Sequence, residues 1–470
     1  MSDLVLQPAV DLLAMISARK LSPLELAEEH ILQIKRLNPQ LNALIDFDEQ
    51  RVRAQAIALD KAAPTGLLHG LPMTIKACIA VAGHRCETGS LFNKGHIPNE
   101  DAVIVERSRQ AGAIIVGTTN CPEFLMAYET DNLLYGRTSN PWDLTRSAGG
   151  SSGGESAAIA AGLSACGFGS DGGGSVREPA HFTGICALKP TPGRIPAAGH
   201  LPPCVGPFSL LGAIGPMART IADVSLLFNV LSGHADADPT GAPVPLQRYT
   251  TEDLQKIPIG FFEDDSIAPV TPETRQAIQD AVRSLRSQGF RVEPFRPRAL
   301  EAARKLWWKY FVRCGAMLLN PIVAGKESRL SPTFQDFLAI ARQDPPLTGY
   351  ELLFAWAECD VIRAALLEEM REFPILLMPV CSVPAFRHGE RQWNIDGRQV
   401  AYLDAMRYTQ WFNLLGAPAA VVPVGRSPEG LPIGIQIAGR PYQDEAVLGI
   451  AAAIERDFGY QPPPLARRVS

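Results

Sequence analysis

The chain has 470 residues, of which 46% are hydrophobic, and this is enough apolar material to bury a large core. Its net charge of −5 supplies no basic excess to neutralise phosphates, so the composition argues against nucleic acid as a ligand. The N-terminal stretch lacks a signal-peptide pattern and no apolar run reaches the ~18–20 residues of a membrane span, so a cytoplasmic location is expected.

The first predicted element is an amphipathic helix that begins after Ser22. Ser22 can cap the helix, Pro23 suits the first helical position, and Glu25 can complete a capping box. Apolar residues follow at near-helical spacing up to Asn38-Pro39, a pair that is predicted to end the helix.

Short apolar runs and helical segments then alternate along the chain. Residues 73–79 and 113–117 are predicted as buried strands, with a helix at 101–111 between them. Further helices are expected at 155–163 and 271–286, and further strands at 375–380, 419–424 and 433–438. Such alternation is typical of an α/β fold whose parallel or mixed sheet carries helices on both faces.

Two later segments differ from this pattern. Residues 300–364 are rich in helix formers and aromatic side chains, and Trp307 and Trp308 are candidates for an apolar substrate pocket. Ordinary packing in the core is the alternative explanation for each of them. Residues 233–249, rich in proline, alanine and aspartate, are predicted as an irregular surface connection.

Cysteine and histidine are scattered rather than clustered. The nine cysteines form no C-x-x-C pair, and the eight histidines form no H-x-x-x-H or H-E-x-x-H motif. This pattern indicates reduced thiols and predicts neither a bound metal nor a cofactor.

Two glycine- and serine-rich segments, 149–154 and 169–179, carry the strongest signal for function. A flexible loop or a phosphate cradle is the simplest explanation, but neither a Gly-Lys-Ser/Thr ending nor a dinucleotide-binding fingerprint in its strand-to-helix context is present. Three glycines before Ser175 allow consecutive backbone N–H groups to converge without Cβ atoms in the way. Such a nest can hold an oxyanion, and Ser175 beside it would be placed to attack a carbonyl carbon.

A serine nucleophile needs a base, and these two segments are followed closely by only one histidine, His181. Lys76 is the alternative, because burial within residues 73–79 would lower its pKa until the neutral amine could accept a proton. On the residues alone, a strand-end lysine that extends its amine to solvent explains the pattern better.

The run GGSSGGESAAIAAGLSACGFGSDGGGSVREPA closely resembles the signature of the amidase signature family, in which GGSSGG precedes GSDxGGSxRxPA. The run LHGLPMTIKACIAVAG resembles the strand that carries the family's catalytic lysine. The separations among Lys76, Ser151 and Ser175 agree with the family pattern. The resemblance extends over nearly the whole chain through segments 188–194, 413–418 and 430–436.

The resemblance implies one domain over residues 1–470, built on a large, twisted, mixed and mostly parallel sheet with helices on both faces. Its signature core would occupy about 70–215. A variable helical region at about 240–370 matches the family only loosely and is a candidate for the substrate pocket.

The resemblance also implies roles for the site residues. Ser175 would be the nucleophile, Ser151, after a cis peptide bond, the proton relay, and Lys76 the base. The oxyanion hole would be formed by the backbone N–H groups of Gly172, Gly173 and Gly174. The positions that brace this loop or donate hydrogen bonds around it would be Ser152, Ser170, Asp171 and Arg177.

Three positions depart from common family patterns. Ala77 stands where many members have aspartate after the lysine. Gly172 stands where many have threonine or isoleucine, and it is expected to leave a looser nest and a roomier pocket. Tyr128 stands where the glutamine-specific branch carries small residues, which makes it a pocket candidate and argues against glutamine as the substrate.

These observations favour an amidase that hydrolyses C–N bonds of small organic amides, with anilides, esters and carbamates as further substrate classes. One alternative is the glutaminase-like A subunit of a tRNA-dependent amidotransferase, and another is a binding protein that kept the fold without the activity. The implied partner is a small amide or carbamate substrate. The sequence leaves open whether the chain is a monomer or a homodimer.

Overall fold

A computed structural model describes residues 4–64 and 66–467. Within them, eleven strands form one large sheet, and β10 (Gln392–Ile395) and β11 (Arg398–Ala401) form a separate hairpin. The strands of the large sheet, in spatial order, are β1 (Leu44–Phe47), β3 (Ile114–Thr119), β2 (Pro72–Lys76), β4 (Cys166–Asp171), β6 (Ala213–Ala218), β5 (Cys186–Lys189), β12 (Ala419–Arg426), β13 (Pro432–Ala438), β9 (Ile375–Pro379), β7 (Ile259–Phe261) and β8 (Val292–Pro294).

The sheet is mixed, as predicted. Parallel pairing joins β3, β2 and β4 near one end of the sheet and β9, β7 and β8 at the other. The strands between these blocks pair antiparallel with their neighbours, as does β1 at the edge. The expected parallel character therefore holds for the two blocks, and antiparallel strands occupy the centre.

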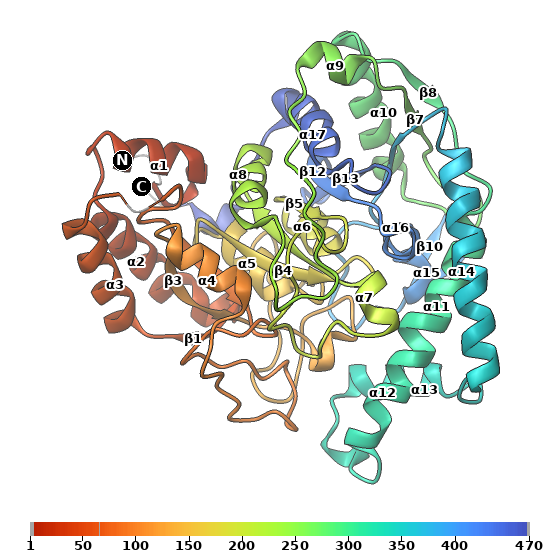
Figure 1. The fold of residues 1–470 in the computed structure, drawn as a ribbon, viewed down its shortest axis with the longest axis horizontal. Coiled ribbons are helices and arrows are strands. Elements are labelled where there is room, and N and C mark those ends of the chain that lie inside the picture. The colour runs from red at the N-terminus through yellow and green to blue at the C-terminus, as the bar shows by residue number, and fades with distance from the viewer. Residues whose placement is uncertain (1–3, 65, 468–470) are drawn as a thin grey trace.

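Helices cover both faces of the sheet (Figure 1). One face carries α1 (Ala9–Ser17), α4 (Val103–Gln110), α8 (Ile221–Leu231), α10 (Pro272–Ser287) and α17 (Asp444–Phe458). The other carries α2 (Pro23–Leu41), α3 (Glu49–Lys61), α5 (Gly153–Ala160) and α6 (Arg177–Thr183). Side chains that alternate along β12 serve the two faces, because Ala420 and Val422 belong to the first core and Val421 to the second.

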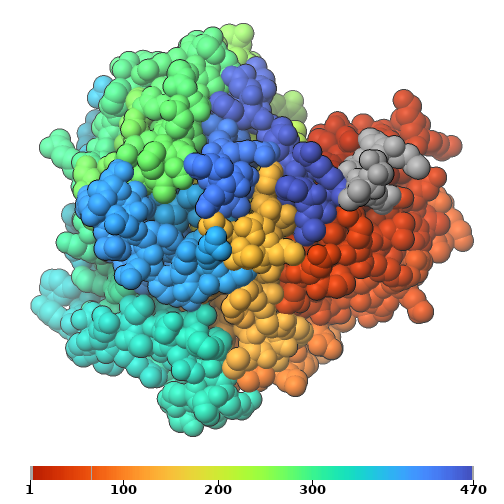
Figure 2. All heavy atoms as spheres, turned by 180° about the vertical axis from the view of Figure 1, so that it is seen from behind, coloured from red at the N-terminus to blue at the C-terminus, as the bar shows by residue number. Residues whose placement is uncertain are grey.

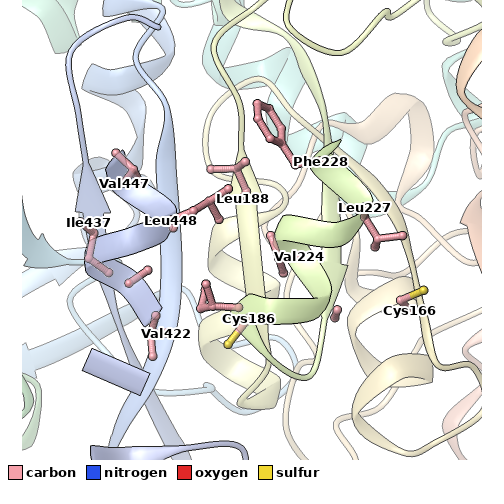
Figure 3. Close-up of a cluster of buried hydrophobic side chains, with 14 of the residues drawn as sticks. Cys166, Cys186, Leu188, Val224, Leu227, Phe228, Val422, Ile437, Val447 and Leu448 are labelled. Atoms are coloured by element: carbon pink, nitrogen blue, oxygen red, sulfur yellow. The ribbon is translucent and has the colours of Figure 1, made fainter. Parts of the chain in front are cut away.

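The core under α8 and α17 is one continuous apolar layer. Its buried residues include Val422 and Ile437 from the sheet and Val447 from α17. Figure 3 shows Leu188 of β5 lying between the side chains of α17 and Val224 of α8. Burial of this layer fixes the strands whose ends carry the candidate site residues.

A third group of helices packs around a separate core, on the side of the molecule opposite α1–α3 (Figure 1). It comprises α11 (Leu300–Trp308), a π-helical turn (Lys309–Arg313), α12 (Cys314–Val323), α13 (Pro332–Ala341), α14 (Gly349–Glu369) and α16 (Gln410–Leu415). Short helices complete the fold: α7 (Pro207–Leu211), α9 (Thr251–Gln255) and α15 (Tyr402–Ala405). From behind, a gold segment near residue 150 separates the red N-terminal part from the teal helical group (Figure 2).

The helix predicted after Ser22 is α2. Its capping box is formed as predicted, since Ser22 Oγ accepts the N–H of Glu25 and the Glu25 carboxylate accepts the N–H of Ser22. The predicted end at Asn38-Pro39 is wrong, because α2 continues to Leu41. Leu41 is buried, and the Asn38 side chain donates to the Leu44 carbonyl and accepts the N–H groups of Ala43 and Leu44. These interactions offset the hydrogen bond that Pro39 cannot donate.

Other expectations from the sequence are confirmed with small shifts of their ends. The strand predicted at 73–79 is β2, which ends at Lys76, and the helix predicted at 101–111 is α4. Residues 233–249 contain neither helix nor strand. All nine cysteines are free thiols, and only Cys204 is not fully buried. Among the described residues, no helix combines the length and apolarity needed to cross a bilayer.

Candidate active site

Lys76 is the last residue of β2, and its side chain lies inside the protein. Alternation along the strand sends Met73 and Ile75 into the core under α8, so Lys76 points to the opposite face, where α5 packs. Lys76 is 0% exposed, and its Nζ lies 2.7 Å from Ser151 Oγ and 3.2 Å from Ser170 Oγ. The alternative of a strand-end lysine that reaches solvent is therefore wrong.

The surroundings of Lys76 favour an uncharged amine. Burial lowers the pKa of Lys76 below its ordinary value, and weaker effects in the opposite direction come from Cys78, Cys121, Asp171 and Glu155. A neutral amine at hydrogen-bond distance from a hydroxyl group can take the proton of that hydroxyl. Both the position and the electrostatics of Lys76 thus suit a base.

Glu155 of α5, to which the sequence assigned no role in the site, lies beside the end of β2. Its carboxyl group accepts hydrogen bonds from Thr74 Oγ1 at 2.5 Å and from Thr119 Oγ1 at 2.7 Å. Thr119 is the register partner of Lys76 in the sheet. Burial raises the pKa of Glu155 to about 8, so at neutral pH this group is mostly uncharged and does little to favour the charged form of Lys76.

Ser151 lies in the loop that enters α5, and its peptide bond with Gly150 is cis, as the resemblance implied. A Cβ at Gly150 would come within 2.5 Å of a backbone nitrogen, so only glycine fits there. The N–H of Ser152 donates to the Ser175 carbonyl at 3.1 Å, and the Ser152 hydroxyl lies 3.4 Å from the backbone of Ser170. These contacts hold the Ser151 loop against the Ser175 loop.

Ser175 stands between β4 and α6, at the end of the glycine-rich loop. Ser175 and Ser151 line the same cavity. Since Ser151 also contacts Lys76, the three side chains lead from a buried amine to the cavity wall. This is the order that a proton relay to a serine nucleophile requires.

One backbone donor of the glycine-rich loop is already engaged. The N–H of Gly174 donates to Asp171 Oδ1 at 2.7 Å, so, contrary to the prediction, it is not available to an oxyanion here. Within the described part of the chain, no group accepts the N–H of Gly172, Gly173 or Ser175. The amide of Ser175 itself therefore replaces that of Gly174 among the candidate oxyanion donors.

The carbonyl groups of the same loop are held by side chains from distant segments. Trp307 Nε1 donates to the Gly172 carbonyl at 2.8 Å. The hydroxyl groups of Tyr128 and Thr409 donate to the Gly173 carbonyl at 2.8 and 2.7 Å. Two of the predicted pocket residues, Trp307 and Tyr128, thus also fix the backbone of this loop.

The expectation that Gly172 leaves a roomier pocket is wrong. A Cβ at Gly172 would lie 2.8 Å from the ring of Phe311, and one at Gly173 would lie 2.5 Å from the ring of Trp307. The two rings are stacked, with centroids 4.8 Å apart and an interplanar angle of 11°. The aromatic pair occupies the space that side chains at these glycines would need.

Asp171 and Arg177 form an ion pair behind the loop, with both side chains 0% exposed and Asp171 Oδ1 2.9 Å from Arg177 Nη2. Burial alone would raise the pKa of Asp171, but the charge and hydrogen bonds of Arg177 hold it well below its usual range. Arg177 also donates to Asn413 Oδ1 at 2.6 Å and to Gln436 Oε1 at 2.5 Å. The predicted bracing pair therefore connects the loop to α16 and β13.

Replacing Arg177 with methionine is expected to destabilise the protein by about 3–5 kcal/mol, because Asp171 would stay buried without its partner charge. The pKa of Asp171 is depressed in the folded state, so this stabilisation is fully present at neutral pH and is lost as the pH falls through the folded-state pKa. Denaturant unfolding at pH 7 measures the loss. Arg371→Met, at an ion pair 74% exposed on the arginine side, should cost at most about 1 kcal/mol, and an equally small loss at Arg177 would contradict the prediction.

Two cavities meet at Ser175. The small chamber, about 90 Å³, is lined by Ser151, Gly172 and mostly apolar side chains from residues 200–213 and α12. The large chamber, about 510 Å³, is lined by Gly173 and side chains of α11, α13 and α15. All the predicted pocket residues line the large chamber: Tyr128, Trp307 and Trp308.

Three residues that hold the loop were not singled out from the sequence: Thr409, Asn413 and Gln436. Gln436 has a recognisable signal, because it is an amide within the otherwise apolar strand PIGIQIA. A fully buried polar side chain in a strand needs a polar partner, and here that partner is Arg177.

The matches to known proteins cover almost the whole chain. The family model described as Amidase matches residues 25–448, a range that includes every site residue named above. An indoleacetamide hydrolase from Bradyrhizobium diazoefficiens is 34% identical over 464 residues, which cover 96% of this chain and 86% of that protein. The A subunit of a glutamyl-tRNA(Gln) amidotransferase from Chloroflexus aggregans is 32% identical over 481 residues, which cover 96% and 97% of the two chains.

The fold has a close counterpart among solved structures. The structure of a 6-aminohexanoate cyclic dimer hydrolase complexed with substrate matches with a TM-score of 0.85 and 26% sequence identity. The match covers 98% of this chain and 100% of that one. The helical group around α11–α14 is therefore part of the shared architecture, together with the sheet.

Proposed function

This chain belongs to the amidase family and is a hydrolase of amide C–N bonds, and we propose that it acts on small organic amides through an acyl-enzyme on Ser175. The observation that carries the proposal is the 2.7 Å contact between Lys76 Nζ and Ser151 Oγ, beside the cavity that Ser175 lines. A buried amine, a bridging hydroxyl and a serine next to free backbone amides supply the parts that acyl transfer needs.

In the first half of the proposed reaction, Ser175 Oγ attacks the carbonyl carbon of the substrate. Its proton passes to Ser151 Oγ while the Ser151 proton passes to neutral Lys76. The carbonyl oxygen becomes negatively charged and is stabilised by the free N–H groups of Gly172, Gly173 and Ser175.

The tetrahedral intermediate then collapses and the C–N bond breaks. Ser151 gives a proton to the leaving nitrogen and recovers one from protonated Lys76, which leaves the acyl group as an ester on Ser175. A water molecule attacks this ester and passes its proton along the same relay. The products are a carboxylic acid and an amine, and Ser175, Ser151 and Lys76 return to their starting protonation states.

The two chambers favour an orientation of the substrate. Because Ser151 must protonate the leaving group, that group belongs in the small chamber, which Ser151 lines. The acyl part then extends into the large chamber, between aromatic side chains. This arrangement supports amides with a sizeable apolar acyl part and a small leaving amine, together with the corresponding esters and carbamates, whose cleavage passes through the same kind of intermediate.

The test is a hydrolysis panel of primary amides, anilides, aryl carbamates and esters with matched groups, with glutamine included. We expect aryl and arylalkyl amides to give the highest kcat/KM and glutamine to give the lowest. A fluorophosphonate probe should modify Ser175, as located by mass spectrometry of the folded protein. Efficient glutamine hydrolysis with weak activity on apolar amides would favour a glutaminase-like role instead, and absence of both hydrolysis and labelling would favour a binding role.

A further inference from the structure

The Gly172–Gly173 peptide is held from one side by a side chain outside the glycine-rich segment. Trp307 Nε1 donates to the Gly172 carbonyl at 2.8 Å, and this peptide bond is trans. In a trans peptide the C=O and the following N–H point in opposite directions. The hydrogen bond from Trp307 therefore fixes the direction of the Gly173 N–H, which has no acceptor among the described residues.

The next peptide of the loop shows the same opposition between a held carbonyl and the following N–H. The Gly173 carbonyl is held by Tyr128 and Thr409, and the opposed N–H of Gly174 points at Asp171 Oδ1, 2.7 Å away. Each peptide plane is thus anchored through its carbonyl. The difference is that the Gly174 amide has an acceptor in the protein and the Gly173 amide does not.

The ring of Trp307 lies beside this peptide in the wall of the large chamber, which Gly173 also lines. Trp307 lines the chamber, is only 1% exposed, and would lie 2.5 Å from a Cβ at Gly173. Phe311 stacks on it and borders both chambers. A group bound in the large chamber can therefore contact the stacked pair of Trp307 and Phe311, of which Trp307 holds the glycine-rich loop.

We propose that Trp307 is a positioning residue that aims the Gly173 N–H at the reacting carbonyl oxygen, and that a planar apolar acyl group packs on its ring. The inference rests on the proposed function. It identifies the substrate class as aryl or arylalkyl carboxamides, whose packing on Trp307 and Phe311 steadies the oxyanion donor. Trp307 belongs to α11, more than 100 residues beyond the glycine-rich segment that carries Ser175.

Trp307→Phe removes the indole N–H and keeps an aromatic ring. We expect kcat on an arylacetamide to fall by about 10- to 100-fold, less than the effect of deleting an oxyanion donor outright, while KM changes little. The Ki of a matched trifluoromethyl ketone, which forms a tetrahedral adduct with the nucleophile, should rise in proportion to the fall in kcat/KM. Binding of the product carboxylic acid should be nearly unaffected.

Two comparisons separate this effect from a general loss of packing. Trp411→Phe removes an equally buried indole whose Nε1 has no hydrogen-bond partner among the described residues, and it should leave the Ki of the ketone unchanged. Incorporation of benzothienylalanine at position 307 keeps the shape of the indole and replaces only its N–H, and it should reproduce the loss in kcat. Tyr128→Phe should have a smaller effect, because Thr409 still holds the Gly173 carbonyl.

Unchanged kcat and ketone affinity in the benzothienylalanine protein would overturn the inference, whatever the stability of Trp307→Phe. A loss of kcat without the matching loss of ketone affinity would overturn it as well. These outcomes are distinct from failure of the proposed function, in which the unaltered protein would hydrolyse no amide in the panel and Ser175→Ala would make no difference.

Discussion

Replacing Ser175 with alanine is expected to lower kcat on the best amide substrate by about 10⁴- to 10⁶-fold, because the atom that forms the bond to the carbonyl carbon is removed. The melting temperature should stay close to that of the unaltered protein, since Ser175 faces a cavity. Initial rates and thermal unfolding of the purified proteins measure the two quantities. Labelling of this position by a fluorophosphonate probe should disappear at the same time.

The matched control is Ser108→Ala. Ser108 is a buried serine of α4, a helix on the face of the sheet opposite to Lys76, and its hydroxyl donates to the Ile104 carbonyl of the same helix at 2.7 Å. This variant should keep the full kcat. Activity of Ser175→Ala within tenfold of the unaltered protein, or an acyl adduct found on another residue, would remove Ser175 from the mechanism.

Replacing Lys76 with methionine is expected to lower kcat/KM at neutral pH by about 10²- to 10⁴-fold, the usual contribution of a positioned base. Methionine fills a similar volume and leaves no unpaired buried charge, so the fold should be retained. In the unaltered protein, kcat/KM should rise with pH through one ionisation below the ~10.4 of free lysine, because burial lowers the pKa of Lys76. Below that pKa the amine carries a proton and cannot accept another.

The assignment of that ionisation needs a comparison with Lys189, which is also buried. Burial lowers the pKa of Lys189 to about 7, so this group titrates in the range of the assay. The rise in kcat/KM should persist in Lys189→Met and vanish in Lys76→Met. A profile that keeps its shape without Lys76 would show that another group is the base.

Much of the fold and of the site could be predicted, because the sequence signals for them are local. The capping box at Ser22, the strand that ends at Lys76 and the glycines before Ser175 each depend on residues a few positions apart. The glycine-rich composition of the same region gave no indication of strand β4, however. Gly167 and Gly169 weaken the apolar pattern of this strand, and yet both are required, because their Cβ atoms would lie 2.0 and 2.6 Å from side-chain oxygen atoms of α5 and its entry loop.

The rest could not be predicted because it depends on long-range contacts and on the rotation of single peptide planes. Nothing local to Trp307 indicates that its indole donates to Gly172, and Thr409 lies even further along the chain from Gly173. Consecutive glycines show that Cβ atoms are absent, but the direction of each N–H is set by the partner of the preceding carbonyl. The engaged amide of Gly174 is the result at this site.

The anchoring of Arg177 has a consequence for the synthesis of the protein. Apart from Asp171, every group to which Arg177 donates comes from beyond residue 400: Thr409, Asn413 and Gln436. A growing polypeptide already contains Lys76, Ser151 and Ser175 when less than half of it has left the ribosome, but the set of groups that hold Arg177 is complete only when Gln436 has emerged. A chain that ends before residue 409 would lack every partner of Arg177 except Asp171, and we expect such a chain to be inactive.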